Sequence, residues 1–234
     1  MRARDKYLHI LFDLDHTLWD YESNSRLALE ELFSIYELGR LQGLTTDRFV
    51  ERFFWVNESL WEQYDNQEIS SAELRQSRFH LILNDFGLRS DEIITHLSAD
   101  YLKLSPTKST VMPYSFEILD YLKPKYQLHI ITNGFYEIQF TKLSFSGLSQ
   151  YFDEVVTSEE AGSRKPHPEI FRHTLDRIGA SSEECIMIGD NLKTDIQGAR
   201  NAAIDHVFFN PSRARHHGTP THEIASLLEL KEIL

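Results

Sequence analysis

Several short apolar runs in this chain end abruptly at polar or glycine residues, and this pattern constrains the fold more than any other feature. The clearest runs, with the residue that ends each, are 8–12 before Asp13, 128–131 before Thr132 and 186–188 before Gly189. Weaker runs lie at 155–156 and 207–209. Short apolar runs between turn residues are typical of buried strands. Helical patterns separate the runs, and this alternation predicts an α/β fold with a doubly wound parallel sheet.

The interval after the first run is much longer than the others. Roughly 120 positions separate Asp13 from Thr132, although one strand-helix-strand unit needs only about 30. The surplus of roughly 85 residues has no convincing strand pattern, but it carries helical periodicity in four segments. These segments are 25–37, 46–65, 71–86 and 91–104. We therefore predict an all-helical insertion at 20–105, with an α/β core formed by 1–19 and 106–234.

The amino-acid composition of the chain limits the classes of molecule that it can bind. Lysine and arginine total 24 against 36 aspartate and glutamate residues, which gives a net charge of -12. Such a chain is unsuited to neutralising the phosphates of a nucleic acid polymer. No signal peptide is visible and no apolar stretch is long enough for a membrane span, so we expect no membrane partner. The single cysteine, Cys185, lies in an apolar run, and a buried free thiol fits a cytoplasmic protein.

Two pairs of carboxylates follow predicted strands. Asp13 and Asp15 stand two positions apart after the first run, and Asp190 and Asp195 follow the run at 186–188. Like charges this close repel unless a divalent cation or a shared proton compensates them. Each pair also has a simpler explanation, because Asp13 and Asp15 could cap a loop and Asp195 could stabilise a helix N-terminus. Neither pair alone establishes a site.

Two further polar elements are expected at the same edge of the sheet. Thr132, Asn133 and Gly134 end the second run with a hydroxyl followed by backbone amides, which suits an oxyanion. Lys165 lies in a compact basic segment whose prolines fix the backbone and open a helix. Ligands of open α/β sheets bind at the carboxyl ends of the strands. The order acid pair, hydroxyl, lysine, acid pair therefore predicts a catalytic site.

This order resembles the four motifs of the haloacid dehalogenase superfamily, and the resemblance covers essentially the whole chain. It implies that Asp13 is the nucleophile and that Asp15 acts as acid and base. It implies that Lys165 and the turn at 132–134 bind the phosphate, and that the insertion at 20–105 is the helical cap of that family. The dehalogenase branch usually lacks an aspartate at the position of Asp15, so the sequence is similar to the phosphatases.

The same resemblance implies a magnesium enzyme. The residues that it assigns to Mg2+ are Asp13, Asp15 through its backbone carbonyl, Asp190 and Asp195, the last with a role in orienting the metal waters or Lys165. One position departs from the family pattern, since His16 stands where many members have glycine. The adjacent Asp15 and Thr17 still fit the motif.

Part of the insertion is similar to bacterial pyrimidine 5'-nucleotidases that remove non-standard nucleotides. The similarity lies in residues 57–69 and 74–79, and the segment 131–135 of the core also fits. The side chains that we expect to bind the base are Asn57, Trp61, Tyr64 and Arg78. Trp61 and Tyr64 are three positions apart on one helical face, where they could stack on a base or pack within a helical bundle.

The expected function is a Mg2+-dependent phosphomonoester hydrolase that forms an aspartyl phosphate and acts on pyrimidine nucleoside monophosphates. The alternatives are a sugar-phosphate phosphatase or phosphomutase, a haloacid dehalogenase, and a non-enzymatic interaction module. A module is the weakest of these, because four carboxylates at strand ends cost stability without a metal. The sequence gives no indication of oligomeric state.

Overall fold

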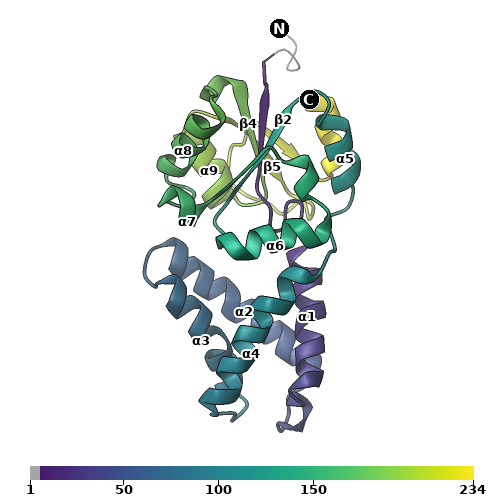
Figure 1. Cartoon of the computed structure of the whole chain (residues 1–234), viewed down its shortest axis with the longest axis vertical. Coiled ribbons are helices and arrows are strands. Elements are labelled where there is room, and N and C mark those ends of the chain that lie inside the picture. The colour runs from purple at the N-terminus through teal and green to yellow at the C-terminus, as the bar shows by residue number, and fades with distance from the viewer. Residues whose placement is uncertain (1–5) are drawn as a thin grey trace. The chain divides into compact units, whose positions relative to one another are not determined.

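The computed structural model describes residues 6–234, and a six-stranded parallel sheet forms its centre. The strands are β1 (His9–Phe12), β2 (Gln127–Thr132), β3 (Glu154–Thr157), β4 (Cys185–Gly189), β5 (Asp205–Phe209) and β6 (His222–Ile224). Their order across the sheet is β3-β2-β1-β4-β5-β6, and every neighbouring pair is parallel (Figure 1). The predicted α/β class with a doubly wound parallel sheet is confirmed.

Strand β1 lies between β2 and β4, so the polar ends of three strands come together. Phe12 pairs with Ile130 of β2 and with Ile188 of β4. Asp13 therefore leaves β1 beside the last residues of both neighbours. The chain builds the sheet outwards from β1 in both directions, and in such sheets ligands bind at the carboxyl ends near the point where the direction changes.

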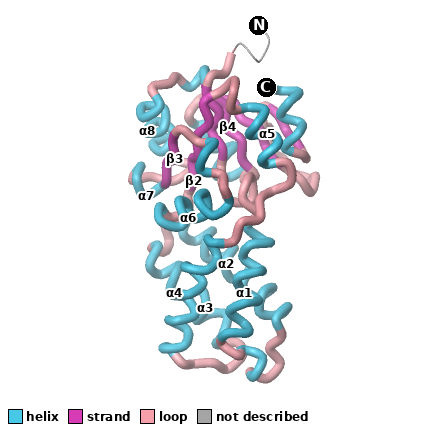
Figure 2. The backbone as a smooth tube through the Cα atoms, turned by 45° about the vertical axis from the view of Figure 1, so that its right-hand side comes forward, coloured by secondary structure: helices cyan, strands magenta, loops and turns pink. Residues whose placement is uncertain are grey.

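Helices cover both faces of the sheet. Ile10 and Phe12 of β1 pack in one apolar cluster, whereas Leu11 packs in another. Successive side chains of a strand point to opposite faces, so the unbroken apolar run of β1 reflects burial on both sides. The helices of the first cluster are α5 (Ser115–Leu122), α6 (Tyr136–Ser146) and α10 (Leu230–Ile233). Those of the second are α8 (Pro168–Ile178) and α9 (Gln197–Asn201), as the tube view also shows (Figure 2); the short α7 (Ser158–Ala161) follows β3.

The chain divides into two compact units, one reaching to Tyr21 and resuming at Ser109–Leu234, the other formed by Glu22–Lys108. The helices between β1 and β2 that build the second unit are α1 (Tyr21–Ile35), α2 (Thr46–Asp65), α3 (Ser71–Asn84) and α4 (Asp91–Leu104). Helix α1 begins before the predicted residue 25, because the polar Asn24 is a fully buried residue inside the helix and not a boundary.

Caps and aromatic packing explain why this segment is helical. Ser70 accepts a hydrogen bond from the backbone of Glu73, whose side chain bonds back to Ser70, so α3 begins with a capping box. Aromatic rings then meet in the middle of the unit, where Phe53 lies 5.8 Å from Phe79 and 4.9 Å from Tyr101 between ring centroids. Aromatic contacts at these distances stabilise a core beyond the area that they bury.

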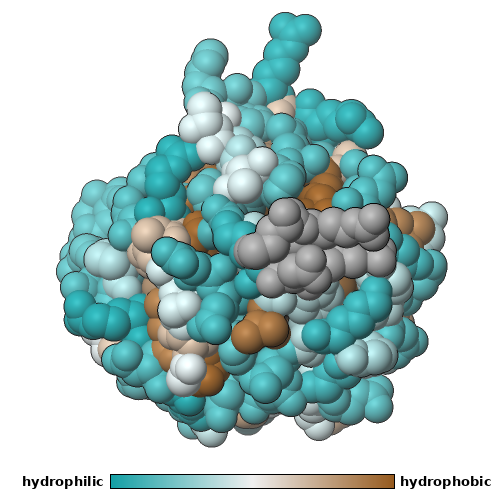
Figure 3. Space-filling view, turned by 90° about the horizontal axis from the view of Figure 1, so that it is seen from above, coloured by the Kyte–Doolittle hydropathy of each residue, from teal (hydrophilic) through white to brown (hydrophobic). Residues whose placement is uncertain are grey.

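The surface is mostly hydrophilic where the amino-terminal ends of the strands face the viewer, with scattered apolar patches (Figure 3). The most exposed large apolar side chains, Ile35, Trp55 and Phe145, belong to three different helices. Within residues 6–234, no helix combines the length and the apolar character that crossing a membrane requires.

Candidate active site

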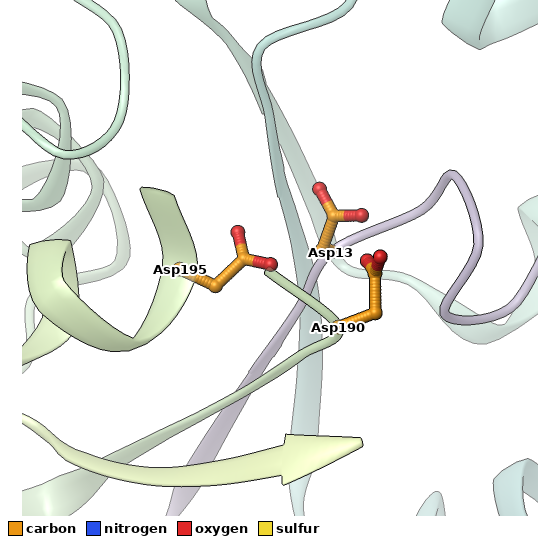
Figure 4. Close-up of side chains that lie close together, drawn as sticks. All are labelled: Asp13, Asp190 and Asp195. Carbon is orange, nitrogen blue, oxygen red and sulfur yellow. The ribbon is translucent and has the colours of Figure 1, made fainter. Parts of the chain in front are cut away.

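Three carboxylates from two adjacent strand ends converge at the carboxyl edge of the sheet. Asp13 follows β1, Asp190 follows β4, and Asp195 lies in the helical turn Leu192–Ile196 that comes next. One oxygen of each lies within 4.8 Å of the others (Figure 4). A Cβ on Gly189 would lie 2.3 Å from Asp195 Oδ2, so only glycine at this position lets Asp195 fold back towards Asp13.

Lys165 lies among these carboxylates with its side chain fully enclosed. Its Nζ donates to Asp13 Oδ1 at 2.6 Å, to Asp195 Oδ1 at 2.6 Å and to the backbone oxygen of Ile131 at 2.8 Å. Asn133 fixes the backbone that carries this lysine, since its Oδ1 accepts from Lys165 N at 2.8 Å and its Nδ2 donates to Lys165 O at 3.0 Å. All three ammonium protons of Lys165 are therefore used within the site.

Burial and mutual repulsion dominate the electrostatics of this cluster. Burial raises the pKa of Asp13 well above its usual value, and nearby Asp195 and Asp190 add to the rise while Lys165 opposes it. Burial and the charge of Asp195 raise the pKa of Asp190 to about 7. Burial alone would lower the pKa of Lys165, but the charges of Asp13 and Asp195 raise it. The ammonium group therefore compensates only part of the negative charge.

The donor set of the cluster fits a hard divalent cation. Asp13, Asp190 and Asp195 offer carboxylate oxygens close enough together to share one ion. Mg2+ prefers oxygen ligands and is usually bound through one or two carboxylates together with waters and substrate phosphates. With one ammonium among three carboxylates, a dication would also offset the repulsion that adds to the effect of burial in raising the pKa of Asp13 and Asp190.

Asp15, two positions beyond Asp13, is held by helix α6. Lys142 Nζ donates to both oxygens of Asp15, at 2.6 and 2.8 Å, and Gln139 Nε2 donates to Asp15 Oδ2 at 2.9 Å. Burial alone would raise the pKa of Asp15, but the charge of Lys142 and the two hydrogen-bond donors lower it. Asp13 and Asp15 therefore have different lysine partners and pKa shifts of opposite sign.

The turn after β2 links Asp15 to Thr132, which is predicted to bind the phosphate. Thr132 Oγ1 accepts from Gly134 N at 3.1 Å and from Gln139 Nε2 at 2.8 Å. The hydroxyl proton of Thr132 is therefore directed away from these two donors and can be given to an anion. Asp190 has a comparable support, because Thr17 Oγ1 donates to its Oδ1 at 3.1 Å.

Sequence reasoning missed the support from α6. Gln139 and Lys142 stand three positions apart in a helix, which is an ordinary spacing for exposed polar residues. Only their positions after the Thr132 turn could have drawn attention, because α6 begins at the same strand end as the site. Asn133 was predicted as part of an oxyanion turn, whereas its side-chain amide bonds both backbone groups of Lys165.

All four residues predicted to bind a base belong to the helical unit, with Asn57, Trp61 and Tyr64 in α2 and Arg78 in α3. Trp61 contacts Tyr64 edge to face, with ring centroids 5.5 Å apart, and Tyr64 is buried. Asn57 is buried, and among the described residues its Oδ1 finds no hydrogen-bond donor. Arg78 is also buried, and its Nε lacks an acceptor within the same part of the chain.

Known proteins resemble the chain over nearly its full length. The pyrimidine 5'-nucleotidase PynA of Streptococcus pneumoniae is 32% identical over 97% of this chain and 95% of its own. The pyrimidine 5'-nucleotidase YjjG of Escherichia coli is 30% identical over 98% of each chain. A glyceraldehyde 3-phosphate phosphatase of Methanothermobacter thermautotrophicus is 28% identical over 96% of this chain and 98% of its own. Relatives therefore include phosphatases of nucleotides and of sugar phosphates.

A solved structure has the same fold. The HAD-hydrolase YfnB of Bacillus subtilis, in a form bound to magnesium, superposes with a TM-score of 0.88 at 30% identity, covering 97% of this chain and 98% of its own. The family model for haloacid dehalogenase-like hydrolases matches residues 7–203, which include Asp13, Thr132, Lys165, Asp190 and Asp195. The chain belongs to the haloacid dehalogenase-like hydrolases.

Proposed function

We propose that this chain is a Mg2+-dependent phosphomonoester hydrolase that acts through an aspartyl phosphate on Asp13. One observation carries the proposal. Asp13 faces Lys165 and two further carboxylates, whereas Asp15, two positions on, is turned to Lys142. This arrangement separates a carboxylate that can attack phosphorus from one that can transfer a proton.

The reaction follows in two balanced steps. In the first, an oxygen of Asp13 bonds to phosphorus, the bond from phosphorus to the ester oxygen breaks, and Asp15 gives its proton to that oxygen. In the second, Asp15 takes a proton from water, the water oxygen bonds to phosphorus, and the bond to Asp13 breaks. The Thr132 hydroxyl, and Lys165 through the donor that it gives up from Asp13, hold the phosphoryl oxygens during both steps.

Mg2+ is the cofactor of this proposal. The carboxylates of Asp13, Asp190 and Asp195, with the backbone carbonyl of Asp15, would hold it. When bound, the ion reduces the repulsion between a carboxylate and a phosphate dianion and stabilises the charge of the transferring phosphoryl group.

The substrates that we propose are pyrimidine nucleoside 5'-monophosphates, including non-standard ones. Every phosphomonoester presents the same phosphate, so discrimination depends on other side chains, of which Asn57, Trp61, Tyr64 and Arg78 are our candidates. Asn57 and Arg78 support this choice, because each keeps a buried polar atom without a partner among the described residues. A ring such as Trp61 can stack on a base. Two of the relatives, at 32% and 30% identity, are pyrimidine 5'-nucleotidases.

The composition supports a small-molecule substrate and an intracellular setting. A net charge of -12 disfavours binding to a nucleic acid polymer. Cys185 is buried and forms no disulfide, which is consistent with the reducing cytoplasm that we propose for this enzyme.

A sugar-phosphate phosphatase is the second candidate, favoured by the relative that acts on glyceraldehyde 3-phosphate. The test is phosphate release from a panel of phosphorylated metabolites with and without Mg2+. We expect the highest kcat/KM for uridine and deoxyuridine monophosphates, and only with the ion. A preference for hexose or triose phosphates would exclude the nucleotidase and leave the phosphatase chemistry intact. Dependence on a bisphosphate activator would indicate a mutase, and halide release from a haloacid would indicate a dehalogenase.

A further inference from the structure

Several short hydrogen bonds outside the carboxylate cluster converge on Asp15. Lys142 is buried, and its ammonium group donates to both oxygens of Asp15 at 2.6 and 2.8 Å. The same ammonium group lies 4.5 Å from the ring centroid of Trp19, which is fully buried. A cation held between a carboxylate and an aromatic face has little freedom to move. Lys142 therefore holds the carboxylate of Asp15 in one orientation.

Gln139 holds the second side of this carboxylate. Its Nε2 bridges Asp15 Oδ2 at 2.9 Å and Thr132 Oγ1 at 2.8 Å. Gln139 is fully buried, and its Oε1 has no hydrogen-bond partner among the described residues. A buried oxygen without a hydrogen-bond donor destabilises the folded state. The amide nevertheless keeps one N–H group on Asp15 and the other on Thr132, which is predicted to bind the phosphate.

The backbone after β2 is shaped around the same amide. A Cβ on Gly134 would lie 1.8 Å from Gln139 Nε2, so any other residue would push the amide out of its bridge. Gly134 N also donates to Thr132 Oγ1 at 3.1 Å, which orients the hydroxyl that Gln139 contacts. One hydrogen-bonded network thus connects the backbone of Gly134, the hydroxyl of Thr132, the amide of Gln139 and the carboxylate of Asp15.

We propose that Lys142 and Gln139 are positioning residues for proton transfer by Asp15. When Asp15 gives its proton to the ester oxygen, the O–H bond of the carboxyl group breaks and an ionised carboxylate remains. The ammonium of Lys142 and the amide of Gln139 stabilise that carboxylate in place, so it is ready to take the proton of the attacking water. This inference rests on the proposed phosphatase mechanism and adds the two residues that keep its acid and base in position.

Substrates whose leaving groups differ in their need for a proton distinguish this positioning role from a merely structural one. A nucleoside or sugar alkoxide leaves poorly and needs a proton, whereas p-nitrophenolate leaves without one. In Lys142→Met and Gln139→Leu we expect kcat for the best alkyl phosphate of the panel to fall about 10²-fold or more. Formation of the aspartyl phosphate from p-nitrophenyl phosphate should continue, because that step needs no acid. The variants should then release a burst of about one equivalent of p-nitrophenolate before a slow steady state.

The matched control is Lys123→Met, which removes an ion pair of 2.7 Å with Asp153 at the amino-terminal end of the sheet. It should keep wild-type rates and show no change in the burst. Thermal unfolding of each variant establishes that it is folded, and Gln139→Leu, which removes no charge, decides the question if Lys142→Met does not fold. Equal losses on both substrates without a burst would overturn the proposal. Failure of the phosphatase assignment itself would show differently, as a wild-type enzyme inactive on every ester.

Discussion

Each unit of this chain buries at least one cation, and Lys165 of the core and Arg78 of the helical unit are held in opposite ways. In the core, Lys165 Nζ donates to two carboxylates and to a backbone oxygen, at 2.6, 2.6 and 2.8 Å. In the helical unit, Arg78 lies over the rings of Phe53 and Tyr101, with its guanidinium carbon 5.5 and 5.6 Å from their centroids. Its Nε has no acceptor among the residues described.

The two cations differ in whether all of their hydrogen-bond donors are used within the protein. A cation whose donors are all used inside the protein fixes the geometry around it and has none free for a ligand until a partner is exchanged. A buried guanidinium whose Nε lacks an acceptor carries a cost that a ligand accepting from that atom would relieve. The carboxylate cluster of the core is therefore held by its own partners, whereas the helical unit keeps buried polar atoms that have no partner among the described residues.

Removing the nucleophile should have the largest effect and should act on every substrate alike. Asp13→Asn keeps the shape of the side chain but removes the charge that attacks phosphorus, so we expect turnover to fall by about 10³-fold or more. Phosphate release from a nucleotide and from p-nitrophenyl phosphate measures it. Asp176→Asn, at an exposed carboxylate of α8, is the matched control and should change neither rate. Residual activity above about 1% would contradict the role of Asp13.

Removal of the metal should also abolish activity on every substrate. Activity should vanish with a chelator and return with Mg2+, and Asp190→Asn should raise the Mg2+ concentration needed for half-maximal activity. Calcium should bind but support little turnover, because its larger radius and looser geometry misplace the attacking carboxylate. Full activity in excess chelator would exclude a metal requirement, and equal rates with calcium would contradict the geometric reason.

The buried ion pairs of the core predict a large loss of stability. Lys165→Met leaves Asp13 and Asp195 buried without their cation, and breaking a buried pair in this way costs about 3 to 5 kcal/mol. Urea unfolding at neutral pH measures the change. Lys231→Met removes a surface pair of 2.8 Å with Glu117 and should cost no more than about 1 kcal/mol. Equal costs for both variants would mean that burial does not distinguish the two pairs.

The same contrast explains what could be predicted from sequence. Buried parallel strands appear as apolar runs that stop at polar residues, so the runs located Asp13, Thr132 and Asp190 at one sheet edge. The order of the motifs added Lys165. The helix predicted to begin at residue 25 begins at Tyr21 instead, and Asn24 is fully buried inside α1, because burial depends on neighbours that are distant in sequence.

The positioning contacts of α6 could not be predicted in this way. Gln139 and Lys142 become partners of Asp15 only when helix α6 packs beside the loop that follows β1, more than 120 residues earlier in the chain. Nothing in their spacing distinguishes them from solvent-exposed residues. The partner that a polar side chain finds is a property of tertiary packing, and helical periodicity reports only which face it occupies.

The helical unit should affect one class of substrate and not another. If Trp61 stacks on the base, Trp61→Ala should lower kcat/KM for a pyrimidine nucleotide by about tenfold or more and leave p-nitrophenyl phosphate almost unchanged. Trp55 on the same helix is 62% exposed, and Trp55→Ala is the matched control, expected to change neither substrate. An equal loss on both substrates in Trp61→Ala would show that this ring only packs against Tyr64.

The smallest effect should be on stability at Arg78, where the comparison between the two cations is tested most directly. Arg78→Met gives up contacts with two aromatic rings, each worth about 0.5 to 1 kcal/mol or somewhat more when buried. It also removes a buried charge whose Nε has no acceptor among the described residues, which favours the variant. The two contributions oppose each other, so we expect the free energy of unfolding to change by no more than about 1 kcal/mol. Turnover of the pyrimidine nucleotide should fall while that of p-nitrophenyl phosphate is kept. A loss of stability as large as that of Lys165→Met would mean that Arg78 is a structural cation like Lys165.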